Sequence, residues 1–320
     1  MRVLFWGTSE FALPPLRALV GEGFDLAGVV TQPDRPVGRS RSTMRPPPVK
    51  ECAVAEGIPV LQPERPRGEG FLREIAELEP EISVVVSYGH ILPAEAIALP
   101  PMGTVNVHAS LLPKLRGASP IQAAIRDGFI ETGVTIMRMV PALDAGPIIL
   151  QARTPIAPDE TAGELELRLS ELGALALVEA LTLLSLGQAS ERAQDEAAAT
   201  YAGKIDRDMA RVPWSEGCGV VARLIRAYDP KPGAHTTLRG EEVKLFGAME
   251  TDEAGDEGGR RPGQVLAIDA DGMLVACGDG AVRIAFAQPA GKKRMDVSAW
   301  ARGRGVAAGD VFGTDGAGDT

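Results

Sequence analysis

Asn106 and His108 stand two residues apart at the end of a short apolar run, so on a β-strand both side chains would lie on one face. An asparagine amide donates hydrogen bonds, and a histidine donates, accepts or carries a charge near neutral pH. The pair suits a carbonyl oxygen that becomes negative during acyl transfer, where one such donor contributes about 3 kcal/mol to the transition state. The structural alternative is that Asn106 fixes the next turn and His108 is a hydrogen-bonded core residue.

Asp144 lies in the turn-like sequence Leu-Asp-Ala-Gly, and a simple turn aspartate is one interpretation. If its loop folds back over Asn106 and His108, the carboxylate would orient His108, favour its charged form and help proton transfer from an attacking amine. No serine or cysteine has a clear partner base in the sequence. We therefore expect direct transfer to an amine, without a covalent enzyme intermediate.

Several other chemistries lack their sequence signature. The first turn, residues 7–11, has one glycine where a dinucleotide site needs three, and the chain has no Walker loop and no nucleophile elbow. Three histidines and three isolated cysteines predict neither a metal site nor a disulfide, which fits a reducing cytoplasm. No apolar stretch is long enough to span a membrane, and the N-terminus has the pattern of a strand rather than a signal peptide.

Two basic clusters interrupt a chain whose net charge is -10. The first contains Arg35, Arg39, Arg41, Arg45 and Lys50. The second contains Arg283, Lys292, Lys293, Arg294, Arg302 and Arg304. Each cluster is either a solvated surface or a local contact for nucleic acid, and the charge pattern alone does not separate the two.

The elements that must position these side chains follow an alternation of apolar runs and helix-like segments over the first 185 residues, which predicts an α/β fold with a parallel sheet. The predicted strands are residues 3–6, 26–31, 58–61, 82–88 and 104–108, with a β pair at 134–140 and 148–156. A capping box at 161–164 begins a long amphipathic helix. Because open α/β sheets bind ligands at the carboxyl ends of their strands, residues 106–113 would line the crevice.

A length of 320 residues predicts two domains, and the composition becomes polar near residues 187–199. Short strands separated by turns follow, which predicts a small β-barrel. We predict a Rossmann-like catalytic domain at 1–187, a linker at 188–203, an OB-like barrel at 204–312 and a mobile tail at 313–320.

Short motifs along nearly the whole chain share their order and spacing with one family. They are FWGTSEFA (5–12), TQPDRP (31–36), PPVK (47–50), YGHILP (88–93), NVHASLLP (106–113), RGASPIQ (116–122), ETGVTIM (131–137), TYA (200–202) and QPAGKK (288–293). In these motifs the chain resembles the methionyl-tRNA formyltransferases, which are folate-dependent formyltransferases. Asn106, His108 and Asp144 match the family's catalytic Asn–His–Asp set.

The resemblance implies 10-formyltetrahydrofolate as formyl donor and methionyl initiator tRNA as acceptor, in a cytoplasmic enzyme that we expect to be a monomer without a metal. The positions that match folate-contacting segments are Ser110, Leu111, Leu112 and Pro113, with Ser87, Tyr88, Gly89, Ile91 and Leu92. The positions that match tRNA-contacting regions are Arg35, Arg39, Arg41, Arg45 and Lys50 on a loop, and Lys292, Lys293 and Arg294 on the barrel.

Two departures and two rival functions accompany the resemblance. Lys231 stands where the family commonly has tryptophan, and residues 39–43 hold fewer lysines than the family pattern. One rival is a folate enzyme of the same fold that acts on a small metabolite or a sugar nucleotide, or that hydrolyses the formyl group; the basic second domain argues against it. The other is a non-catalytic RNA-binding protein, against which the intact Asn–His–Asp set argues.

Overall fold

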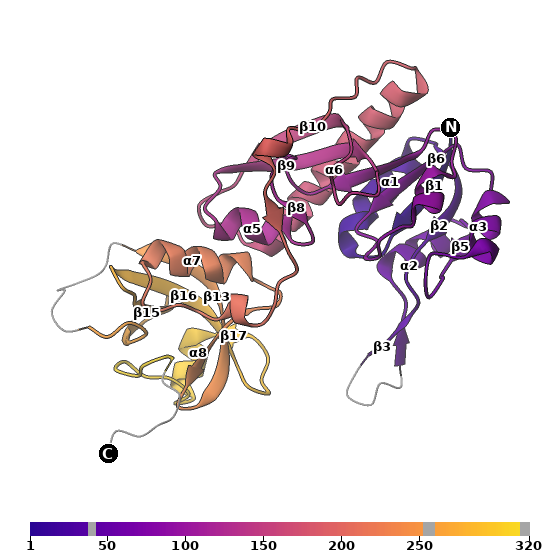
Figure 1. The fold of residues 1–320 in the computed structure, drawn as a ribbon. Helices are drawn as coiled ribbons and strands as arrows, with labels where there is room; N and C mark the ends of the chain where they lie inside the picture. Colours follow the sequence, from indigo (N-terminus) through magenta and orange to yellow (C-terminus); the bar gives the residue numbers. More distant parts are fainter. Residues whose placement is uncertain (38–42, 252–259, 314–320) are drawn as a thin grey trace. The chain divides into compact units, whose positions relative to one another are not determined.

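The computed structural model describes residues 1–37, 43–251 and 260–313, and the chain forms two compact units (Figure 1). The first unit contains Met1–Pro120, Glu131–Pro155 and Glu166–Gly203. The second contains Ile121–Ile130, Ile156–Leu165 and the chain from Lys204 onward. Two short segments of the predicted catalytic domain thus group with the second unit. The predicted limits of the domains and the linker stay a prediction, and tail residues 314–320 lie outside the described chain.

A seven-stranded sheet, in the order β10-β9-β7-β6-β1-β2-β5, is the centre of the first unit. Its parallel strands are β1 (Arg2–Gly7), β2 (Asp25–Val30), β5 (Val60–Leu61), β6 (Ile82–Val86) and β7 (Thr104–His108). The strands β9 (Glu131–Arg138) and β10 (Ile148–Pro155) run antiparallel at one edge. The predicted α/β fold with a Rossmann-like parallel sheet is confirmed.

Helices cover both faces of this sheet, and its central strands β1 and β6 are accordingly buried along almost their whole length. Leu4 and Trp6 pack against α3 (Glu69–Ala76) and α4 (Ala94–Ala98) in one buried cluster. On the other face, the helix α6 (Ala162–Ser185) approaches β7 and β9, where a Cβ on Gly173 would lie 3.0 Å from Val107. The predicted capping box is present, since Thr161 and Glu164 bond each other's backbone N–H groups. The other helical segments here are η1 (Glu10–Ala12), α1 (Leu13–Gly21) and α2 (Pro48–Ala55).

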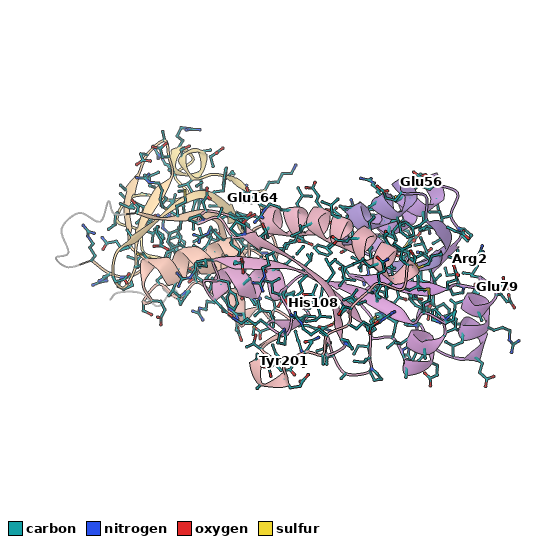
Figure 2. All side chains as sticks on the ribbon, turned by 90° about the horizontal axis from the view of Figure 1, so that it is seen from above. Arg2, Glu56, Glu79, His108, Glu164 and Tyr201 are labelled. Carbon is teal, nitrogen blue, oxygen red and sulfur yellow. The ribbon has the colours of Figure 1, made fainter. Side chains whose placement is uncertain are left out.

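The parallel register brings the strand ends to one edge of the sheet. Val85 of β6 lies opposite Asn106 of β7, and Trp6 of β1 lies opposite Val85. Figure 2 shows the consequence, with Arg2 and Glu79 together near the amino ends of β1 and β6 and His108 away from them. The carboxyl edge that the sequence predicted as the crevice therefore carries the candidate residues.

The polar segment after α6 runs back along the first unit. Its strand β11 (Tyr201–Ala202) pairs in parallel with β8 (Arg116–Gly117), and Arg192 forms a bridge with Ile148. A short helix, η2 (Glu196–Ala198), lies between these contacts. A separate hairpin is made of β3 (Arg35–Val37) and β4 (Thr43–Arg45).

The second unit is built on an antiparallel sheet in the order β12-β13-β16-β15-β14, with β17 paired to β16. Its strands are β12 (Ala234–Leu238), β13 (Glu241–Thr251), β14 (Val265–Ile268), β15 (Met273–Ala276), β16 (Ala281–Pro289) and β17 (Met295–Asp296). Val311 bridges Gln264, the residue before β14, and Phe312 bridges Leu238 of β12, so the two residues close the sheet towards a barrel. The predicted small C-terminal barrel is confirmed.

Helices complete the second unit. They are α7 (Cys218–Ala227), α8 (Val297–Arg302) and the short η3 (Asp208–Ala210), while α5 (Pro120–Arg126) and α6 contribute residues to both units. Figure 1 shows α7 lying along β13 and β16. Within the described ranges, none of the helices is both long and apolar enough to cross a membrane.

Arg294 joins a buried carboxylate and two aromatic rings of the second unit. It forms an ion pair of 2.7 Å with Asp229, which is 3% exposed, and it lies over the rings of Phe246 and Phe286 at 4.5 and 4.6 Å. Asp229 also accepts a hydrogen bond from Gly247 N–H. A buried carboxylate without its cation is costly, so the pair supports the fold.

We predict that Arg294→Ala lowers the free energy of unfolding by about 2 kcal/mol, because it leaves Asp229 without its cation. Chemical denaturation of the full chain measures the change. The control is Lys293→Ala, which removes the same charge from an exposed neighbour and should change stability by less than about 0.5 kcal/mol. Equal losses in both variants would contradict a structural role for Arg294.

Candidate active site

Asn106 and His108 lie on the same face of β7, as their spacing predicted. Asn106 lies opposite Met137 of β9, and His108 opposite Thr135. His108 is 6% exposed, whereas Asn106 is half-buried. Within the described chain, the Asn106 amide has no hydrogen-bond partner. It is therefore free to donate to a substrate oxygen.

The His108 ring lies between two acceptors. Its Nε2 atom is 3.0 Å from the carbonyl oxygen of Leu115, and its Nδ1 atom is 3.7 Å from Oδ2 of Asp144. Because a carbonyl oxygen only accepts, Nε2 carries a proton and donates a hydrogen bond to the Leu115 carbonyl oxygen. A second proton on Nδ1 would face the Asp144 carboxylate. The arrangement thus suits a positively charged ring next to the strand end.

The loop of Asp144 folds back to His108. The functional interpretation of Asp144 required this return, and the local sequence alone could not predict it. Asp144 Oδ2 accepts a hydrogen bond of 2.8 Å from Gly117 N–H. Its backbone is in the left-handed region, with φ of 48°, which aspartate tolerates better than most residues. Two residues later, a Cβ on Gly146 would overlap the carbonyl oxygen of Arg138, so the chain crosses itself closely there.

Left-handed backbone is concentrated around this site. Of the six such non-glycine residues in the described chain, Ser87 follows β6, Leu115 binds the His108 ring and Asp144 faces it. Residues in this conformation persist where the surrounding structure holds them, and they gather at functional sites.

The two predicted folate-contacting segments each divide into inward and outward residues. Ser110 and Leu112 are buried: the Ser110 hydroxyl donates to Lys114 O, and Leu112 N–H donates to Thr135 Oγ1. Leu111 and Pro113 are half-buried. The inner residues hold the loop, so the outer two are the ones that a ligand at the edge would meet.

The turn after β6 shows the same division. Tyr88 and Leu92 are buried, while Ser87, Gly89 and Ile91 are exposed. The carbonyl oxygen of Tyr88 accepts hydrogen bonds from Thr8 Oγ1 and Gln32 Nε2, and burial raises the pKa of its phenol to about 12. Tyr88 therefore anchors the turn in the protein interior, and its neighbours Ser87 and Gly89 lie at the surface.

The predicted tRNA-contacting cations also differ in their surroundings. Arg35 donates to Gln32 Oε1, and Lys50 forms an ion pair of 2.8 Å with Asp34. Arg45, Lys292 and Lys293 are exposed, Arg294 pairs with Asp229, and Arg39 and Arg41 lie outside the described residues. Lys231 lies in an exposed loop of the second unit. The described residues hold no cluster of histidine, cysteine or carboxylate side chains suited to a metal ion.

The sequence missed Arg116 and Gln194, which lie behind the Asp144 loop. Arg116 is 1% exposed and donates to Gln194 Oε1, and Gln194 donates to the carbonyl oxygen of Asp144. Arg116 belongs to the RGASPIQ motif, which was a usable signal for a buried role. Gln194 stands in a polar segment without periodicity, and nothing in that pattern distinguishes it from a linker residue.

The sequence that forms this sheet with its Asn–His–Asp group, and the small barrel after it, matches two family models of one enzyme class. The family described as formyl transferase matches residues 1–181, and the formyl transferase C-terminal domain matches residues 204–305.

Relatives with the same two-part chain are methionyl-tRNA formyltransferases. The one from Moorella thermoacetica is 44% identical over 313 residues, which cover 98% of this chain and 99% of the relative. The one from Pseudomonas putida strain GB-1 is 44% identical over 315 residues, covering 98% and 100%. The chain belongs to the methionyl-tRNA formyltransferase family, which confirms the resemblance seen in the motifs.

Solved structures with low identity share the fold. HypX from Aquifex aeolicus in complex with tetrahydrofolic acid has a TM-score of 0.67 at 20% identity, covering 93% of this chain and 46% of HypX. The sugar 3N-formyl transferase WlaRD also has a TM-score of 0.67, at 17% identity, covering 92% and 99%.

We predict that Gly146→Ala lowers the free energy of unfolding by about 1–3 kcal/mol, because the new methyl group must displace the Arg138 carbonyl. Thermal or chemical denaturation checks this. Gly21→Ala is the matched control: no atom lies within 4 Å of its added Cβ, so its stability should be unchanged or slightly higher. A Gly146→Ala protein as stable as the control would mean that the Asp144 loop is not tightly held.

Proposed function

We propose that this protein transfers the formyl group of 10-formyltetrahydrofolate to the amino group of methionyl initiator tRNA. Its membership of the methionyl-tRNA formyltransferase family supports the two substrates. The observation that carries the site assignment is the His108–Asp144 pair, which lies beside the unpartnered amide of Asn106. Catalysis is assigned to these three residues.

The reaction needs a neutral amine and a stabilised formyl oxygen. A new bond forms between the amine nitrogen and the formyl carbon, and the bond from that carbon to the folate nitrogen breaks. In between, the formyl oxygen carries negative charge. The Asn106 amide donates to this oxygen, and such a donor is worth about 10²–10³-fold in rate.

His108 supplies positive charge next to the same oxygen. Asp144 stabilises the charged ring through Nδ1, and the Leu115 carbonyl holds Nε2. Over the whole reaction the amine loses one proton and the folate nitrogen gains one, so the pair also suits proton transfer. A direct contact between His108 and the formyl oxygen requires the ring to exchange one of its acceptors for the substrate.

The folate would lie along the carboxyl edge of the sheet. Ser87, Gly89 and Ile91 are exposed there, and Leu111 and Pro113 are accessible on the neighbouring loop. Four buried residues would support this edge from the interior: Ser110, Tyr88, Leu112 and Leu92. Holding both substrates here turns their encounter into a step between positioned groups, which contributes much of the rate.

We propose that the tRNA binds the basic residues whose charged groups are exposed to solvent. Arg45, Lys292 and Lys293 are exposed, and Arg39 and Arg41 join them on sequence grounds. Because the chain carries a net charge of -10, local basic surfaces direct the RNA rather than overall attraction. We further propose a cytoplasmic monomer without a metal requirement, which accords with the free cysteines 52, 218 and 277.

The assay that tests this function is formyl transfer from 10-formyltetrahydrofolate to charged initiator tRNA. Asn106→Ala and His108→Ala should each lower kcat by about 10²–10³-fold, because each removes stabilisation of the oxyanion. Affinity for the tRNA should stay within about twofold, since these side chains do not contact phosphates.

His235→Ala is a control of matched residue type, since His235 lies in the second unit and should leave kcat unchanged. Wild-type protein that releases formate, or that formylates only small amines, would remove the tRNA assignment. Full activity in the Asn106 or His108 variant would remove that residue from the site.

Neutralising Lys292 and Lys293 together should weaken tRNA binding and lower the slope of log K against log salt by up to about 2, because two phosphate contacts are lost. Binding titrations at several salt concentrations measure both quantities. Arg17→Ala with Arg73→Ala is the control, since it removes the same charge from exposed helix positions outside the predicted set. Equal slopes in the two double variants would show that Lys292 and Lys293 are merely solvated.

A further inference from the structure

The polar segment that follows α6 contacts both loops that hold the His108 ring. We propose that residues 190–203, called the strap below, act as a positioning element for catalysis, chiefly through Gln194 and Thr200. The inference rests on the proposed catalytic roles of His108 and Asp144. The strap touches no substrate in this proposal: it acts through the residues that it holds.

Gln194 holds the Asp144 loop. Its Nε2 atom donates two hydrogen bonds of 2.8 Å, one to the carbonyl oxygen of Asp144 and one to that of Gly146. These bonds hold the backbone at the close crossing with Arg138 and two residues before it. They therefore fix the point from which the Asp144 carboxylate reaches His108.

A buried arginine fixes the direction of the Gln194 amide. Arg116 donates to Gln194 Oε1 from both Nε and a terminal nitrogen, at 3.1 and 2.8 Å. Because a guanidinium only donates, it binds the amide oxygen and turns the amide nitrogen towards the two carbonyl groups. The same guanidinium binds Glu196 at 2.7 and 2.9 Å, so two strap residues satisfy it.

Thr200 holds the other partner of His108. Its Oγ1 atom accepts a hydrogen bond of 2.9 Å from Leu115 N–H, and its carbonyl oxygen accepts one of 2.8 Å from Arg116 N–H. Leu115 has the left-handed φ of 59° and presents its own carbonyl oxygen to His108 Nε2. The strap thus binds the residues on both sides of the imidazole ring.

The strap also lies directly against the donor to Asp144. A Cβ on Gly117 would be 2.5 Å from the carbonyl oxygen of Ala202, so the two backbones meet with no side chain between them. Gly117 N–H is the group that binds Asp144 Oδ2. Ser119 continues the contact, since its N–H donates to Ala202 O at 3.3 Å.

The character of these contacts indicates positioning rather than bulk stability. Glu196 and Thr200 are exposed, Gln194 is half-buried, and the strap adds little to the apolar core. Most of its polar contacts fall on residues 113–119 and 144–148, which carry both partners of His108. The others join Glu191 to Arg138, Arg192 to Gln151 and Gln194 to Met137. Small displacements of reacting groups lower rates far more than they lower stability.

The experiment is a double-mutant cycle between Gln194→Ala and Asp144→Ala, read as the single-turnover rate of formyl transfer at saturating substrates. Gln194→Ala alone should lower this rate by roughly tenfold or more, with both substrate affinities within about twofold. On the Asp144→Ala background the same change should cost less than about twofold, because the carboxylate that Gln194 positions is already gone.

Two further variants separate positioning from general damage. Gln188→Ala makes the same substitution at an exposed position in the predicted linker and should leave the rate unchanged. Thr200→Val removes the acceptor for Leu115 N–H at similar size, whereas Thr200→Ser keeps a hydroxyl and should retain more of the rate than Thr200→Val.

Each outcome addresses a different claim. If Gln194→Ala costs the same factor with and without Asp144, the strap is only structural and the inference fails while the site stands. A Gln194→Ala enzyme as fast as wild type also overturns it. If Asp144→Ala itself transfers formyl groups at the wild-type rate, the proposed catalytic site fails instead.

Discussion

The His108 ring between two acceptors is the interaction on which the rest of the site depends. One acceptor is the backbone carbonyl of Leu115 and the other is the carboxylate of Asp144. A nearly buried imidazole needs such partners, since a buried polar nitrogen without a partner is unfavourable. Neither partner lies on a strand of the main sheet, so the sheet alone cannot hold the ring in position. The active geometry is therefore a property of two loops and of whatever fixes them.

Strand direction explains why the loops need help. His108 ends β7 opposite Thr135, but β9 runs antiparallel and ends at Arg138, opposite Val105. Three residue steps along a strand span about 10 Å, so the chain leaves β9 away from the ring and must return. The close crossing at Gly146, the left-handed Asp144 and the Gln194 bonds all serve this return. The strap contacts both this loop and the Leu115 loop.

The sequence predicted those parts of the fold and site that produce a regular pattern of residue types. Apolar runs predicted the parallel strands, and a two-residue spacing placed Asn106 and His108 on one face. The catalytic role of Asp144 was predicted from the resemblance to the family, because local sequence does not show that its loop folds back to His108. The strap has a polar composition and was predicted as part of a linker; hydrogen bonds from glutamine and threonine to backbone groups produce no periodicity. Arg294 was likewise predicted as a tRNA-contacting cation, and its ion pair with Asp229 could not be predicted because the two residues lie far apart in sequence.

The loop of Asp144 is held by polar contacts with the strap rather than by apolar packing, and this has an energetic consequence. A strap hydrogen bond between neutral groups contributes only about 0.5–1.5 kcal/mol, whereas those of the buried, charged Arg116 guanidinium contribute about 1.5–3 kcal/mol each. The sheet beneath is held by a continuous apolar core, whose opening requires global unfolding. Detachment of the strap is therefore less costly than unfolding of the sheet, and it releases Asp144 and Leu115 together. If His108 and Asp144 have the proposed catalytic roles, catalytic competence is a local equilibrium, with a smaller free energy than the stability of the fold that carries it.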